Sequence, residues 1–130
     1  LLQLLGSQND MATIRLFDML FTGDLEGQGE ESLLEGALTG PYDVLKAAHH
    51  GSREANSEAF IEAVSPRVSV ISAGVDNRYG HPHPETLERL TAAGSRIYST
   101  VQQGAVRIET DGETMVVRRF PLVKEGKIPL

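Results

Sequence analysis

Three short apolar segments, at residues 14–23, 42–48 and 67–73, constrain the fold most, because each one leads through a polar loop into a helical pattern. Strands that alternate with helices are typical of βαβ units and a parallel sheet. The third segment has almost no polar alternation, which indicates a strand buried on both faces. The sequence therefore predicts an α/β fold.

Three segments have the apolar spacing of amphipathic helices. The first covers residues 30–38. The second follows an N-cap at Asn56 or Ser57, and the third starts at Pro84 with His83 as its N-cap. The apolar faces consist of Leu33, Leu34, Ala37 and Leu38, then Phe60, Ile61, Ala63 and Val64, then Leu87, Leu90 and Ala93.

The C-terminal part is predicted to be β structure. A short strand is expected at residues 96–99. Residues 105–110 and 113–120 then flank Asp111-Gly112, and an Asp-Gly pair between alternating apolar residues is a strong hairpin signal. We therefore expect a mixed sheet with three helices and a C-terminal β-hairpin.

The composition excludes several classes of protein. The 130 residues include 12 Lys and Arg against 18 Asp and Glu, so the net charge is −6 and the basic surface of a non-specific nucleic-acid binder is absent. The chain has no cysteine, which excludes a disulfide framework and thiolate-bound metals. Its apolar runs are far shorter than the roughly 20 residues of a transmembrane helix.

The residues suited to chemistry lie in the three loops that follow the strands. Asp24 follows the first strand, His49 and His50 follow the second, and His81 and His83 precede the third helix. Ligands gather beyond the carboxyl ends of strands in open α/β folds, and a carboxylate with imidazoles suits zinc, manganese or iron.

Each residue also has a simpler interpretation. Asp24 is also a common type of turn residue, and the histidine pair could be a surface pair. His81 could cap a turn, and His83 could be only the N-cap of its helix. Ser52 lies near His50, but no nucleophile elbow surrounds it.

Three stretches of the chain resemble a known family. LFTGDLE at residues 20–26, DVLKAAHHGS at 43–52 and NRYGHPHP at 77–84 are similar to the metallo-β-lactamase superfamily. More narrowly, they resemble the ComEC family of bacterial DNA-internalisation competence proteins. The resemblance implies the C-terminal half of an αββα sandwich over residues 1–120, with a tail at 121–130.

The resemblance also implies a site for two divalent metals, zinc or manganese, in the intact domain. Asp24 would bridge the metals and act in catalysis, with His49 or His50 as the next ligand and His50 preferred. The substrate phosphate would lie near His81 and His83, with Arg78 and Ser52 as further substrate-binding residues.

One motif of the superfamily is absent. HxHxDH supplies most of its metal ligands, and this chain lacks that string, so we take the chain to lack the N-terminal half of the domain. We expect this fragment alone to be inactive and to hold no metal tightly. We also expect it to self-associate through the face that the missing half would cover.

The resemblance implies a soluble domain of a bacterial inner- or plasma-membrane protein, with the side of the membrane left open. The parent would be a metal-dependent phosphodiesterase or nuclease that processes incoming DNA as a single strand. Its partners would be that DNA, the missing half and the channel segments of the same polypeptide. Two alternatives remain: a non-catalytic accessory or interaction domain of the DNA-uptake channel, and a small-phosphoester hydrolase.

Overall fold

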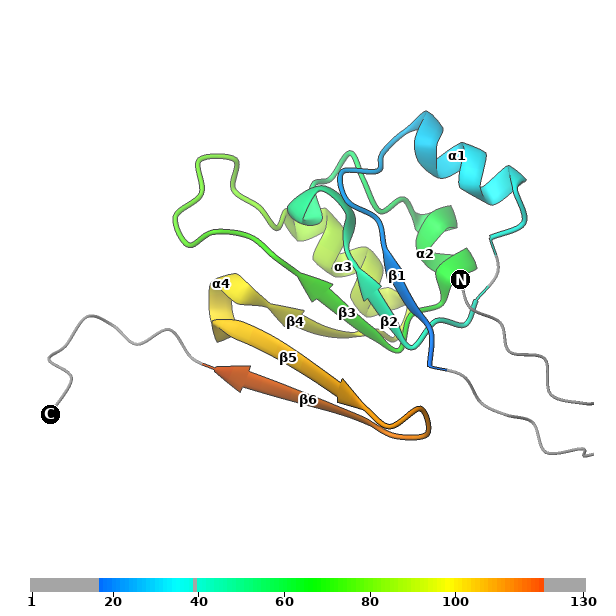
Figure 1. Cartoon of the computed structure of the whole chain (residues 1–130). Coiled ribbons are helices and arrows are strands. Elements are labelled where there is room, and N and C mark those ends of the chain that lie inside the picture. Colours follow the sequence, from blue (N-terminus) through cyan, green and yellow to red (C-terminus); the bar gives the residue numbers. More distant parts are fainter. Residues whose placement is uncertain (1–16, 39, 121–130) are drawn as a thin grey trace, which may run out of the picture.

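A parallel sheet forms the centre of the structure, a computed structural model that describes residues 17–38 and 40–120 (Figure 1). Its strands follow one another in sequence order and are β1 (Met19–Phe21), β2 (Val44–Lys46), β3 (Val68–Ile71) and β4 (Arg96–Ser99). This arrangement confirms the α/β fold class. The start of the first expected strand and the expected tail at 121–130 lie outside the described residues.

Three helices connect these strands. They are α1 (Gln28–Glu35), α2 (Glu58–Val64) and α3 (Pro84–Ala92), and α2 packs beside both α1 and α3. Figure 1 shows α2 and α3 against one face of the sheet. Within the described ranges, no helix combines the length and the apolar character needed to span a bilayer.

The core lies between the sheet and the helices. Leu45 of β2 and Ile71 of β3 are fully buried against Phe60 of α2 and Leu90 of α3. β3 is almost entirely buried, as its apolar sequence predicts. Burial of these side chains supplies most of the driving force that fixes the helices on the sheet.

Local backbone geometry corrects the bounds of the first helix and the second strand. α1 begins at Gln28 and ends at Glu35, earlier than the expected 38, because Gly36 caps it and Ala37 has a left-handed φ of 67°. β2 ends at Lys46, because the chain then enters a 3-10 turn, η1 (Ala48–Gly51).

The expected N-caps of the other two helices occupy their positions. Ser57 is the N-cap of α2, and its Oγ accepts the N–H of Phe60 at 3.3 Å. His83 is the N-cap of α3, but its side chain makes no capping hydrogen bond to that helix. The other candidate N-cap of α2, Asn56, has a different role in the structure.

The C-terminal elements confirm the hairpin and correct its turn. β4 has the expected bounds, and a single unexpected helical turn, α4 (Thr100–Gln103), leads into β5 (Ala105–Thr110) and β6 (Met115–Phe120). The turn has four residues rather than two, since Thr110 pairs with Met115. Asp111 stabilises it by accepting the backbone N–H groups of Glu113 and Thr114 at 2.9 and 2.7 Å.

Leu45→Ala should destabilise this core strongly, because the Leu45 side chain is fully buried. We expect the free energy of unfolding to fall by about 2–5 kcal/mol in denaturant titrations. Leu33→Ala is the matched control, since the Leu33 side chain is 38% exposed, and it should cost much less. Equal losses in the two variants would contradict this assignment of the core.

Candidate functional site

Three loops meet at one edge because β1, β2 and β3 are parallel neighbours whose carboxyl ends lie together. The N–H of His49, in the loop after β2, donates to the carbonyl of Gly23 after β1 at 2.8 Å. The N–H of His83, before α3, donates to the carbonyl of Gly51 at 2.9 Å. Backbone hydrogen bonds therefore tie the three loops to one another.

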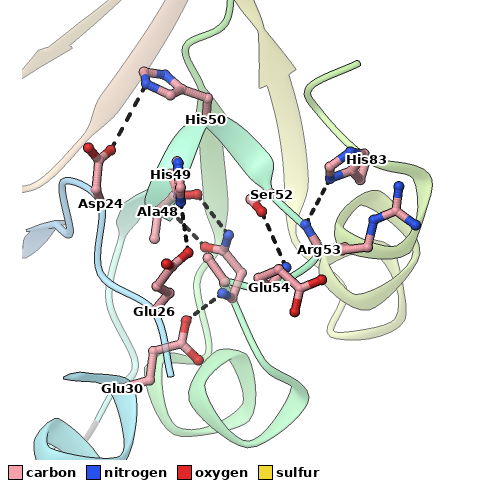
Figure 2. Close-up of polar contacts among 12 residues, drawn as sticks. Asp24, Glu26, Glu30, Ala48, His49, His50, Ser52, Arg53, Glu54 and His83 are labelled. Carbon is pink, nitrogen blue, oxygen red and sulfur yellow. Dashed lines mark hydrogen bonds and ion pairs between the residues drawn. The ribbon is translucent and has the colours of Figure 1, made fainter. Parts of the chain in front are cut away.

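Asp24 and all four histidines converge at this edge. The Nε2 of His50 lies 4.0 Å from the Oδ1 of Asp24, and these side chains are 54% and 74% exposed (Figure 2). The ring centre of His81 lies 6.3 Å from that of His50, 5.7 Å from that of His49 and 4.7 Å from that of His83. The site is thus an open surface cluster.

The protein holds two of the histidine rings by their Nδ1 atoms. The Nδ1 of His50 lies 2.7 Å from the carbonyl of Ser72, which only accepts, so this nitrogen carries a hydrogen. The Nδ1 of His49 lies 2.8 Å from a carboxylate oxygen of Glu26. Metal-binding histidines are oriented by such bonds, which leave Nε2 as the ligand atom.

The pair of Asp24 and His50 has the electrostatics of a cation site. In a neutral His50 with its hydrogen on Nδ1, the Nε2 lone pair faces the carboxylate of Asp24, which is also an acceptor. Two acceptors 4.0 Å apart are stabilised by a proton or a cation between them.

The histidine loop has an unusual backbone. His49 and His50 both have left-handed conformations, with φ of 46° and 55°. A residue other than glycine in this region costs about 1–3 kcal/mol, and such strain gathers at functional sites. The surrounding structure must therefore hold this loop.

A buried polar network supplies that support. The carboxylate of Glu30, 3% exposed, accepts the backbone N–H groups of Asn56 and Ser57. The carboxamide of Asn56 in turn accepts the N–H of Ala48 at 2.8 Å and donates to its carbonyl at 3.0 Å. The network thus fixes the residue directly before the histidine pair (Figure 2).

Gly51 allows the second and third loops to come together. Its φ is +82°, and a Cβ atom there would lie 2.7 Å from the Cβ of Pro82. Glycine avoids this overlap because it has no Cβ atom, and it adopts a positive φ without strain. The N–H of Arg53 also donates to the Nδ1 of His83 at 3.0 Å, which strengthens the link.

Ser52 and Arg78, the other two expected substrate-binding residues, lie in different surroundings. Ser52 is 5% exposed, its Oγ accepts the N–H of Glu54, and its carbonyl accepts the hydroxyl of Thr86. Arg78 lies farther along the loop before α3, where its guanidinium donates to the hydroxyl of Tyr79.

Several supporting residues have no clear signal in the sequence. Glu26, Glu30 and Asn56 act through contacts between residues far apart in the chain. Lys46 also lies close enough to the site to interact with Asp24. Burial lowers the pKa of Lys46, and the negative charge of Asp24 opposes that shift. The sequence does place Lys46 at the end of β2, directly before the histidine loop, which indicates a position near the site.

The donor set suits a borderline divalent cation, because it combines imidazoles with a carboxylate. Within the part of the chain that the structure describes, no three His, Asp or Glu side chains are placed to bind one ion. Asp24 and His50 are close enough to share an ion and would supply two ligands. Zinc sites normally have three or four protein ligands, so this pair alone is an incomplete site.

Asn56→Gly tests the buried network, because glycine keeps the left-handed φ of 57° but removes the carboxamide. We expect a loss of about 1–3 kcal/mol in the free energy of unfolding, because Ala48 loses both hydrogen bonds. The NMR signals of the His49 and His50 rings should shift. Asp76→Gly is the control, since Asp76 has a φ of 56° but is exposed; shifts as large in that variant would contradict the role of the network.

The histidine cluster should make stability depend on pH. Burial, followed by the positive charges of His83, His49 and His50, lowers the pKa of His81 from 6.5. The unfolded chain therefore binds more protons just below pH 6.5, and the folded chain loses stability as pH falls through that window.

His81→Gln should remove part of this dependence. Between about pH 7.5 and about pH 5.5, the free energy of unfolding of the variant should fall less than that of the wild type. Denaturant titrations at both values measure the difference. A slope as steep as that of the wild type would show that His81 is not the group responsible.

The chain is similar to segments of three larger bacterial proteins. It is 40% identical over 88 residues to ComE operon protein 3 of Bacillus subtilis strain 168, a match that covers 68% of this chain and 11% of the relative. It is 40% identical over 90 residues to competence protein ComA of Neisseria gonorrhoeae, covering 68% and 13%. It is 37% identical over 90 residues to recombination protein 2 of Haemophilus influenzae, covering 69% and 11%.

These proteins are homologues of the chain, which spans only a small part of their length. No family model matches the chain. No solved structure matches it.

Proposed function

We propose that the chain is part of a bacterial DNA-uptake protein of the ComEC family, and that its histidine edge belongs to a metal-dependent phosphodiesterase. The similarity to competence protein ComA and to two further homologues supports the first part. The parent would lie in the inner or plasma membrane, with its channel segments in the same polypeptide. Its substrate would be incoming DNA, processed as a single strand.

One observation carries the catalytic part of the proposal. The Nε2 of His50 and the Oδ1 of Asp24 face each other across 4.0 Å at the edge where the other histidines gather. A chain of net charge −6 needs local positive charge to bind a phosphodiester, and bound cations supply it. Asp24 and His50 would hold divalent zinc or manganese, with His49 as the alternative to His50.

The bound metals would polarise the phosphoryl oxygen and lower the pKa of water. Glu26 and the carbonyl of Ser72 keep the rings of His49 and His50 oriented for this task. His81 and His83 would bind the substrate phosphate from the neighbouring loop. In this proposal the parent domain belongs to the metallo-β-lactamase superfamily. The part of the parent that precedes this chain supplies the remaining metal ligands.

Asp24→Asn in the intact parent protein tests the catalytic role of this edge. The amide removes the negative charge that would hold the cations, so DNA cleavage with zinc or manganese should fall about 100-fold or more. The assay measures release of nucleotides from a labelled single strand. Glu113→Gln makes the same chemical change on the exposed hairpin and should leave cleavage unchanged.

The same assay separates the alternatives. Cleavage that persists in the Asp24→Asn protein would overturn the catalytic assignment. A wild-type parent that cleaves no phosphoester would favour an accessory domain of the uptake channel. Hydrolysis of a small phosphodiester such as bis(p-nitrophenyl) phosphate without cleavage of DNA would favour a small-phosphoester hydrolase.

A further inference from the structure

The loop between β3 and α3 carries an exposed aromatic side chain beside the histidine cluster. This loop projects beyond the end of β3 (Figure 1), and the Tyr79 side chain within it is 59% exposed. Asn77 braces the loop by donating to the carbonyls of Gly74 and His81, at 2.8 and 2.7 Å, and by accepting the N–H of His81 at 2.8 Å. Tyr79 is therefore presented to solvent on a braced loop.

The ring of Tyr79 continues a row of rings that leads to the proposed reaction site. Its plane lies 21° from that of His81, with the ring centres 5.7 Å apart. The plane of His81 in turn lies 20° from that of His50, with centres 6.3 Å apart. The row ends 4.0 Å from Asp24, so it joins an exposed aromatic surface to the polar site.

Arg78 contacts Tyr79, the outermost ring of this row. Its guanidinium donates to the hydroxyl of Tyr79 at 2.6 Å, and its Cζ lies 4.8 Å from the centre of the ring. The contact orients the phenol ring and places a positive charge over part of its face. A planar arginine next to an aromatic ring is a common surface for stacking an unpaired base.

We propose that Tyr79, oriented by Arg78, stacks an unpaired base of a single-stranded nucleic acid whose phosphate lies at the histidine cluster. This inference rests on the proposed function and identifies the residues that recognise its substrate. Phosphate contacts alone are weak for a chain of net charge −6, so stacking has to contribute much of the affinity. Paired bases present no free face, so the platform selects single strands.

Fluorescence anisotropy with two probes tests this inference on the 130-residue chain. The probes are a labelled oligothymidylate and an abasic oligonucleotide of equal length, both with manganese present, because the 130-residue chain alone is expected to be inactive. In Tyr79→Leu, the dissociation constant for oligothymidylate should rise roughly 5- to 150-fold, the range for loss of one stacked base, whereas that for the abasic probe should not change.

Two variants serve as controls. Tyr79→Phe keeps the ring and should retain most of the preference for the thymidylate probe. Phe120→Leu removes an exposed aromatic side chain from the hairpin and should change neither affinity.

Three results would overturn the inference: equal binding of both probes by the wild type, no effect of Tyr79→Leu, or an equal loss for both probes. Failure here differs from failure of the proposed function, which is judged by Asp24-dependent cleavage in the parent. A preference for bases without such cleavage would leave Tyr79 as a binding platform only.

Discussion

The site depends on the parallel pairing of three adjacent strands. Because β1, β2 and β3 run in the same direction and neighbour one another, residues separated by long stretches of chain leave the sheet at one edge. The side chains on the helix side of these strands belong to the apolar core, so packing also holds the edge in place. A reversal of any of the three strands would carry its loop to the opposite edge and break up the cluster.

The cluster is supported at a cost in local strain. His49 and His50 have left-handed backbones, and their loop is held by the Asn56 carboxamide and, through it, the buried carboxylate of Glu30. A buried carboxylate is tolerated because two backbone N–H groups satisfy it. The polar interior beneath the histidines therefore fixes the backbone that leads into the histidine pair.

The sequence predicts the features that depend on local patterns. The apolar run of β3 and the signals at Pro84 and Gly94 identify a buried strand and the third helix, because strand burial and helix ends follow from neighbouring residues. The end of α1 differs from the prediction, because Gly36 caps the helix within the apolar pattern that continues to Leu38, and the left-handed backbone of Ala37 leaves no sequence signal. The four-residue hairpin turn was also missed, because the hydrogen bonds of Asp111 compete with the tighter Asp-Gly turn.

The candidate site also combines residues that a local pattern predicts with residues that only contacts between distant positions reveal. Asp24 and the histidines were found because each follows a strand or precedes a helix, which a pattern reveals. The residues that support the histidine loop were not predicted, because the hydrogen bond between Glu30 and Asn56 joins residues 26 positions apart. Such contacts exist only once the helices have packed.

The contact between Gly51 and Pro82 has a consequence for how this protein can evolve. A side chain at position 51 would occupy the place of the proline ring, and a different ring position at 82 would draw the third loop away from the second. A substitution of Gly51 would therefore separate His50 from His81. In evolutionary terms, position 51 is expected to stay glycine, because any other residue there would separate the loops that carry the histidines.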